Sequence, residues 1–308
     1  MAGSRASRVQ RPTTPPAVCL TERDMDILDD LARVRLLTAE LVEQLHFPPQ
    51  DGPRARGFSS SCRTRLRLLW QAGYVVRHWP DRFQGPPVYA LDRRGKQALV
   101  AHRGRAAGDL ASLGREPSPL FLGHALVIAR VYAAVVPALT TMPDIHLADF
   151  WGEHRFKGRG RYDRLRDPAD SRKRIPVVPD ALLQFARPDG RRRLVFLEVD
   201  QGTMTLARIA TKIRGYEAYR IGTGPATFEQ RFGCPPVFSL ALVAPTPARR
   251  QSLQQTVRRE LQHQGWLARA ERYLFHCLPD LDPATALTWE DTRGQAVSLL
   301  GERGPGEV

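Results

Sequence analysis

The chain has few cysteines, few lysines and no long apolar run. Its four cysteines are scattered and lack the paired spacing that zinc sites use. This pattern predicts reduced thiols in a cytoplasmic protein. No stretch of about 18 residues is apolar throughout, so we expect no membrane span. The first residues contain no apolar signal segment, and residues 1–18, rich in Arg, Pro, Ser and Thr, predict a disordered tail.

The scarcity of lysine makes the charge of the chain almost entirely arginine. Only four residues are lysine, at positions 96, 157, 173 and 212, yet the net charge is +14. Codon bias in a GC-rich genome could enrich arginine without any function, so its distribution matters. Residues 54–105 carry twelve Lys/Arg against two Asp/Glu, and residues 154–174 carry nine against three. This concentration favours a polyanion as partner, specifically double-stranded DNA.

Residues 19–105 predict a small N-terminal domain. Thr21, Thr38 and the serines at 59–61 are typical helix starts, each followed by apolar residues at helical spacing. Two short strands, at 74–79 and 88–91, follow the third helix and flank a Gly/Pro turn. Three helices followed by a β-hairpin predict a winged helix.

The third helix of this domain carries the predicted DNA contacts. Arginines reach phosphates and guanine edges, and serine hydroxyls at a helix N-terminus meet phosphate. The hairpin arginines would touch the flanking backbone. The predicted set is Ser60, Ser61, Arg63, Arg65, Arg67, Arg77 and Arg82. A winged helix used for protein contacts or for a homodimer is the alternative.

Residues 106–120 predict a linker, because breakers are frequent and periodicity is weak. Residues 121–292 then alternate apolar helices with strands, which predicts an α/β (α+β) domain with a mixed sheet flanked by helices. We expect a helix at 122–136, a strand near 145–156 that carries Glu153, and a basic loop at 157–174. Residues 293–308 predict a second tail.

An acidic hairpin is the most informative feature of the second domain. Residues 175–187 and 191–200 predict two strands joined at Pro188-Asp189-Gly190. If these three residues form the loop with Gly190 left-handed, Asp180 faces Glu198. Because side chains alternate along a strand, Asp180, Glu198 and Asp200 then share one face. A two-residue turn would instead move Asp180 to the opposite face.

Clustered carboxylates at the end of a buried strand indicate a metal site. The apolar run 194–197 predicts a strand buried on both faces, and Glu198 follows directly at the end of this buried run. Carboxylates a few ångströms apart repel, and a divalent cation with oxygen ligands relieves this repulsion. A solvated strand end paired with neighbouring arginines is the alternative. The predicted ligands of Mg²⁺ or Mn²⁺ are Asp180, Glu198 and Asp200.

The acidic motif resembles the core of the PD-(D/E)xK nuclease superfamily. Pro179-Asp180 and Glu198-Val199-Asp200 match it, except that Asp200 stands where the family usually has Lys. Some members move this lysine to the following helix, which makes Lys212 the candidate here. The resemblance implies a metal-dependent endonuclease with Asp180, Glu198, Asp200 and Lys212 as catalytic residues. Glu153 is a further candidate as a ligand of the metal or of a water, and a surface acid is the alternative for it.

The order of further pieces resembles the bacterial replication-relaxation family of plasmids and integrative elements. These pieces are Leu-Thr-Glu-Arg-Asp at the first helix, Arg-Leu-Arg-Leu-Leu before Gly-Tyr, the helix around His124, Pro-Asp-Ala-Leu-Leu, Phe-Leu-Glu-Val-Asp-Gln-Gly-Thr and Lys-Ile-Arg-Gly-Tyr. The resemblance covers residues 20–250. It implies a role in plasmid replication and DNA relaxation, with a winged helix joined to a nuclease-like domain.

Three functions are therefore in competition. A nickase of a mobile element is the main hypothesis. A non-catalytic replication or transcription regulator with a degenerate nuclease fold is the alternative, supported by Asp200 at the usual Lys position. A relaxase that forms a phosphotyrosine would need a His-hydrophobic-His motif, which the dispersed histidines do not form. No nucleotide-cofactor motif is evident.

Overall fold

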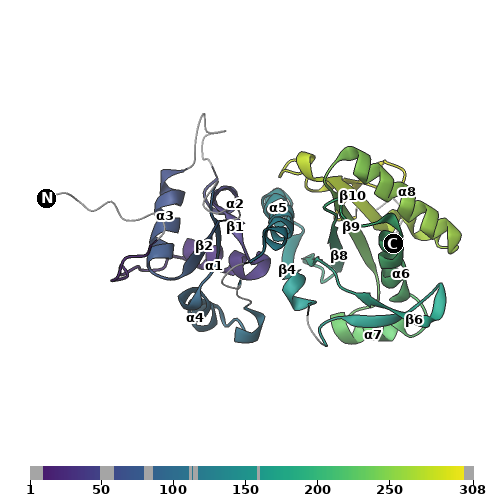
Figure 1. Cartoon of the computed structure of the whole chain (residues 1–308), viewed down its shortest axis with the longest axis horizontal. Coiled ribbons are helices and arrows are strands. Elements are labelled where there is room, and N and C mark those ends of the chain that lie inside the picture. Colours follow the sequence, from purple (N-terminus) through teal and green to yellow (C-terminus); the bar gives the residue numbers. More distant parts are fainter. Residues whose placement is uncertain are drawn as a thin grey trace. The chain divides into compact units, whose positions relative to one another are not determined.

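The computed structural model describes residues 10–48, 59–79, 86–110, 113, 117–157 and 160–301. The chain divides into two compact units, Met1–Ala133 and Ala134–Val308. Figure 1 shows the helices and strands of both units, coloured along the chain. The division falls inside one long helix, downstream of the linker predicted at 106–120.

The first unit contains helices and a small antiparallel sheet. The sheet has the order β1-β3-β2, so its first strand comes from between the first two helices. The elements are α1 (Glu22–Val34), β1 (Leu37–Thr38), α2 (Ala39–His46), α3 (Ser60–Gln71), β2 (Val75–His78), β3 (Val88–Leu91) and α4 (Arg93–Arg103). The predicted three helices and the two later strands are present, and β1 is an additional strand.

Side-chain caps explain where these helices begin. Thr21 and Asp24 form a reciprocal capping box at the start of α1, and Thr38 caps α2. Ser59 caps α3 by accepting from the backbone N–H of Cys62 at 3.3 Å. The predicted helix starts are therefore confirmed. Ser60 and Ser61 follow this cap as exposed residues of the first turn.

Helix α5 (Pro119–Leu139) spans the division between the units. It is longer than the predicted helix at 122–136. Among the described helices, α5 alone is long and apolar enough to cross a bilayer, judged by length and composition. This finding corrects our expectation that no segment of the chain would be long and apolar enough to do so. Half of the qualifying stretch is buried within the protein, as in the core helix of a folded domain.

The second unit is built on a seven-stranded mixed sheet of order β12-β11-β10-β9-β8-β7-β4. Its central strands β8, β9 and β10 are parallel, and the outer pairs are antiparallel. The strands are β4 (His146–Gly152), β7 (Ala181–Ala186), β8 (Arg192–Val199), β9 (Phe238–Ala244), β10 (Tyr273–Cys277), β11 (Thr288–Glu290) and β12 (Ala296–Ser298). This agrees with the predicted α/β class.

Three helices and a separate hairpin complete this unit. The helices are α6 (Leu206–Ala218), α7 (Gly224–Phe232) and α8 (Pro247–His263), and the hairpin is β5 (Asp163–Asp167) with β6 (Asp170–Val177). The basic segment 157–174, which we expected to be a loop, therefore supplies most of a hairpin. Its apolar residues Leu165, Ile175 and Val177 are buried on one side, and the many charged residues between them obscure this alternation in the sequence.

Two other predictions about the second unit were wrong. The strand expected at 175–187 is two strands, because the chain leaves β6 at Val177 and enters β7 at Ala181. The tail expected from residue 293 contains β12, which pairs with β11 through Trp289 and Val297. Trp289 is buried, so this C-terminal hairpin adds to the folded unit.

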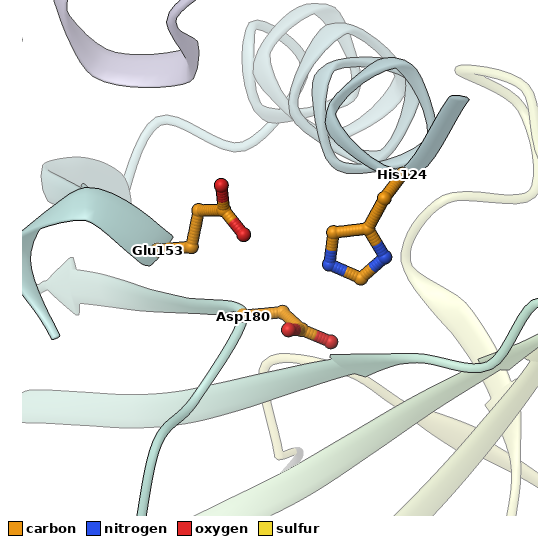
Figure 2. Close-up of side chains that lie close together, drawn as sticks. All are labelled: His124, Glu153 and Asp180. Atoms are coloured by element: carbon orange, nitrogen blue, oxygen red, sulfur yellow. The ribbon is translucent and has the colours of Figure 1, made fainter. Parts of the chain in front are cut away.

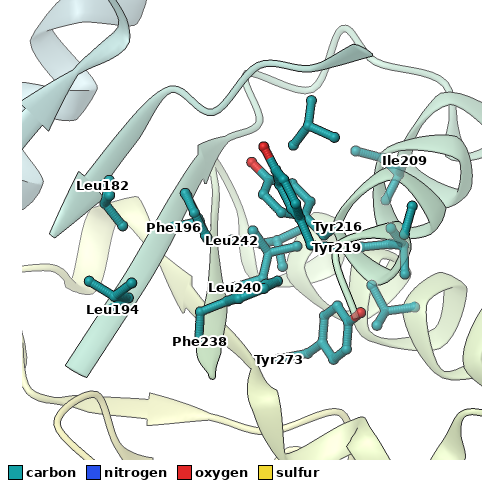
Figure 3. Close-up of a cluster of buried hydrophobic side chains, with 14 of the residues drawn as sticks. Leu182, Leu194, Phe196, Ile209, Tyr216, Tyr219, Phe238, Leu240, Leu242 and Tyr273 are labelled. Carbon is teal, nitrogen blue, oxygen red and sulfur yellow. The ribbon is translucent and has the colours of Figure 1, made fainter. Parts of the chain in front are cut away.

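An aromatic core joins the helices to the sheet (Figure 3). Phe196 of β8 lies between Tyr216 of α6 and Phe238 of β9, with ring centroids 5.4 and 5.0 Å away. The rings meet in tilted or edge-to-face arrangements, which stabilise a core beyond simple burial. This packing fixes α6 over the end of β8, where the acidic residues lie.

Candidate active site

The β7–β8 hairpin has the predicted register. Gly190 has a left-handed backbone with φ of 82°, and its N–H donates to the Arg187 carbonyl at 3.0 Å. Arg187 pairs with Arg191, and further along Ala181 lies opposite Leu197. Asp180 therefore lies one step beyond the last pair, beside Glu198. The two-residue turn is excluded, and the prediction that depended on the three-residue loop is confirmed.

Asp180 is held rigidly at the end of β7. Its N–H donates to the Leu197 carbonyl at 3.1 Å, and its Oδ2 accepts from the Val199 N–H at 2.8 Å. The side chain thus caps the end of the neighbouring strand. Only 8% of Asp180 is exposed, so its charge lies in a largely desolvated position.

Glu153 joins Asp180 from the end of β4 (Figure 2). A carboxylate oxygen of Glu153 lies within 4.8 Å of one of Asp180, and Glu153 is 2% exposed. Glu153 also forms an ion pair with Lys157 one helical turn later. Figure 2 draws His124 with these two acids; it lies on the part of α5 that belongs to the first unit.

Glu198 is the third buried carboxylate, at 2% exposure. Its Oε1 accepts from the Tyr216 hydroxyl at 2.6 Å, and its Oε2 forms an ion pair with Lys212. Burial raises the pKa of Glu198 to about 7, and the nearby Asp180 carboxylate adds to the rise. Lys212 and Tyr216 only partly oppose this effect. Burial therefore outweighs the stabilising contacts of the Glu198 carboxylate with Lys212 and Tyr216.

Lys212 occupies the position that was predicted for it, leaning from α6 toward the strand ends. Burial disfavours its charged form, but the Glu198 and Asp180 carboxylates raise its pKa above the ordinary value. Lys212 is thus held as an ammonium among acids. Neither Tyr216 nor its hydrogen bond to Glu198 was predicted; its spacing of four residues from Lys212 on the same helix was the available signal.

Asp200, two residues after Glu198, has partners that differ from those of Glu198. It forms an ion pair with Arg249 of α8, and its Oδ1 accepts from the Gly202 N–H at 3.0 Å. Arg249 also donates to the Met204 carbonyl at 2.5 Å. Asp200 is 3% exposed, and its interactions tie the loop after β8 to the start of α8. No pattern along the chain indicated that Arg249 would be its partner.

The arginines predicted to contact DNA differ in their surroundings. Arg63 and Arg67 are exposed on α3. Arg65 instead forms an ion pair with the fully buried Asp24 and donates to the Cys19 carbonyl at 2.8 Å. Arg65 therefore holds the start of α1 to α3.

Arg77 is also occupied within the first unit. Its guanidinium stacks 4.1 Å from the Trp70 ring centroid and 5.5 Å from that of Tyr89. Burial lowers its pKa. Arg77 thus packs against the sheet and α3, and its predicted contact with the DNA backbone stays a prediction. Arg82 lies outside the described residues.

Comparison with known proteins gives one match. Residues 28–232, more than half of the chain, match the replication-relaxation family. This range includes α3, Glu153, Asp180, Glu198 and Lys212. No curated protein and no solved structure matches the chain. The chain belongs to the replication-relaxation family.

Proposed function

We propose that this protein binds double-stranded DNA and that its second unit is a metal-dependent endonuclease, specifically a nickase. Membership of the family indicates a role in plasmid replication or relaxation. The observation that carries the nuclease proposal is the convergence of three buried carboxylates and one half-buried lysine. Glu153, Asp180 and Glu198 are each less than 10% exposed, and Lys212 pairs with Glu198.

The donor set fits a hard divalent cation. Mg²⁺ and Mn²⁺ take oxygen ligands, and Asp180 with Glu198 would supply them, with Glu153 as a third. A bound cation would neutralise excess carboxylate charge and lower the pKa of a coordinated water. Asp200 contributes less in this proposal, because Arg249 already occupies one of its oxygens.

The roles of the remaining residues follow from their contacts. Lys212 places an ammonium beside the carboxylates, where it stabilises the negative charge that develops on a phosphate oxygen. Tyr216 donates to Glu198 and fixes the orientation of that carboxylate. The backbone N–H of Val199 does the same for Asp180. The site is thereby preorganised before any substrate arrives.

The order of elements in the first unit supports the proposal that this unit binds DNA. Three helices and a three-stranded antiparallel sheet are the parts of a winged helix, with α3 as the recognition helix. The exposed Ser60, Ser61, Arg63 and Arg67 are suited to phosphate and base contacts. Arg65 and Arg77 support this surface through their contacts with Asp24 and Trp70.

A non-catalytic regulator is the second candidate, and one observation favours it. Lys212 pairs with Glu198 and Lys157 pairs with Glu153, so two of the three carboxylates have a cationic partner within the chain. Such pairs hold a fold together without any metal. The nuclease fold would then act as a platform for DNA or for a second copy of the chain.

Incubation with supercoiled plasmid tests the nuclease proposal. We expect conversion to the relaxed form with Mg²⁺ or Mn²⁺, none with EDTA, and none for Asp180→Asn. Isothermal titration should show Mn²⁺ binding that Asp180→Asn removes while circular dichroism stays unchanged. A wild-type protein that binds DNA yet never nicks the plasmid would favour the regulator.

A charge-reversal pair tests DNA binding by α3. Arg63→Glu with Arg67→Glu should weaken binding of a duplex at least tenfold, because each phosphate contact releases counterions. The matched control is Arg258→Glu with Arg259→Glu, an exposed pair on α8. Equal losses for both pairs would show that only total charge matters and would contradict the proposed role of α3.

A further inference from the structure

The β5–β6 hairpin has one apolar face and one basic face. Leu165, Ile175 and Val177 are buried, and Gly215 of α6 lies so close that a Cβ there would stand 3.0 Å from Ile175 Cγ2. Arg164, Arg166 and Arg174 are exposed. The apolar face therefore anchors the hairpin on α6, and the basic face is held outward on a fixed support.

Two of these arginines face each other across the hairpin. Arg166 pairs with Arg174 in the strand register, and Arg174 also donates to the Arg164 carbonyl at 3.5 Å. Like charges directly opposite on a sheet destabilise it. Within the described part of the chain, none of the three arginines has a carboxylate in an ion pair. Their positive charge is therefore uncompensated.

The acids of the same strand are already engaged elsewhere. Asp163 pairs with Arg231 at 3.3 Å and accepts from the Tyr219 hydroxyl at 2.6 Å. Asp167 pairs with Arg214 at 3.0 Å. These contacts fix the ends of β5 to α6 and α7. Asp170, at the start of β6, pairs with Lys173 at 3.1 Å. The acids of the hairpin are therefore paired with residues other than these three arginines.

A cavity of about 780 Å³ lies between this hairpin and the connection from α6 to α7. Arg164, Arg166 and Arg174 line one side together with Asp163 and Asp167, whose carboxylates are already paired with Arg231 and Arg214. Residues 221–224, which carry no acidic side chain, line the other. Guanidinium groups around an open cavity match the charge and fork geometry of a phosphate.

We propose that this arginine cleft, formed by Arg164, Arg166 and Arg174 with residues 221–224, binds the phosphodiester backbone of DNA. The proposal rests on the proposed DNA-binding function and adds a second contact surface, located in the second unit. Binding in the cleft does not depend on the DNA sequence, because phosphate contacts position a duplex without identifying its bases. It would hold DNA by the same unit that carries the carboxylate cluster.

The test is salt-dependent duplex binding by the full chain in EDTA, where no cleavage is needed. Replacing all three arginines by Gln should reduce the slope of log affinity against log salt by about 3, since each lost phosphate contact removes about one. Affinity should fall at least tenfold. The triple Lys variant keeps the charges and should keep the slope. The matched control replaces the exposed Arg258, Arg259 and Arg293 by Gln and should leave the slope unchanged.

Three results would overturn the proposal. One is an unchanged slope in the triple Gln variant, and another is an equal loss in the control. The third is inorganic phosphate or ATP binding to the wild type but not to the Gln variant while DNA affinity stays the same, which would assign the cleft to a small phosphorylated ligand. Because cleavage is not measured, failure of the nicking assay leaves this result intact.

Discussion

Glu198 and Asp200 are two residues apart at the end of β8, yet their surroundings differ. Both are buried and both pair with a cation, Lys212 for Glu198 and Arg249 for Asp200. Asp200 adds a backbone N–H donor, so its charge is balanced locally. Glu198 has a second carboxylate, Asp180, close enough to raise its pKa. Within the described residues, the partners of Asp200 include no second carboxylate, whereas Glu198 shares its buried position with one.

This difference separates a structural carboxylate from a candidate catalytic one. When a buried acid pairs with one well-placed arginine, the ion pair offsets the desolvation cost of the acid and joins two elements of the fold. A buried acid among other acids retains a need for positive charge, which a metal ion can meet. Burial alone therefore does not identify a ligand, whereas the balance of charges around the acid does.

The largest expected effect is on nicking. Glu198→Gln should lower the nicking rate at least about a hundredfold, because it removes a charge from the site where the metal is proposed to bind. Asp200→Asn should lower it by less than about tenfold, since Arg249 occupies that side chain. Plasmid relaxation with Mg²⁺ measures both, at a temperature where circular dichroism shows both folded. Equal losses would remove the distinction between the two acids.

Lys212→Ala should also lower nicking about a hundredfold while metal and DNA binding remain, because one transition-state electrostatic contact is lost. Lys212→Arg should recover only part of the nicking rate. The positive charge is kept, but the planar guanidinium does not place it where the compact ammonium of lysine stood. Asp200→Lys in the Lys212→Ala background should not recover it, because the new ammonium would stand beside Arg249. Recovery in that double variant would show that position 200 belongs to the site.

The free energy of unfolding should respond differently at Asp200 and at Asp180. Asp200→Asn leaves Arg249 without its charge partner in a mostly buried place, which should cost about 3 kcal/mol of unfolding free energy. Asp180→Asn in the metal-free protein relieves repulsion with Glu198 and should leave the free energy unchanged or raise it. Urea unfolding in EDTA measures both. A loss of similar size for Asp180→Asn would mark it as structural.

The smallest expected effect is on pH dependence. Glu198 has a folded pKa of about 7 against an ordinary value of 4.5, so the folded state binds more protons between these values. Unfolding free energy of the metal-free protein should therefore fall as pH rises from 4.5 to 7, by on the order of 1 kcal/mol or more. Glu198→Gln should remove this fall and Asp200→Asn should keep it. Urea unfolding at pH 5 and pH 7 checks the sign.

Local sequence determined the elements that position the acids. The turn Pro188-Asp189-Gly190 set the register of β7 and β8, because only a three-residue loop with a left-handed Gly190 places Asp180 beside Glu198. The helical period of α6 placed Lys212 near the strand ends. Thr21, Thr38 and Ser59 marked the helix starts. These features depend on residues within a few positions of each other.

Tertiary structure decided which charges are available. Arg65 reaches Asp24 across 41 positions, and Arg249 reaches Asp200 across 49. The pattern of charges along the chain does not indicate such distant pairings. Arg63, Arg65 and Arg67 on α3 therefore look equivalent in the sequence, although Arg65 links α3 to α1. The β5–β6 hairpin could not be predicted for the same reason. Its apolar residues become buried only when α6 packs against them. Ion pairs and burial form between distant segments, and only the folded chain determines them.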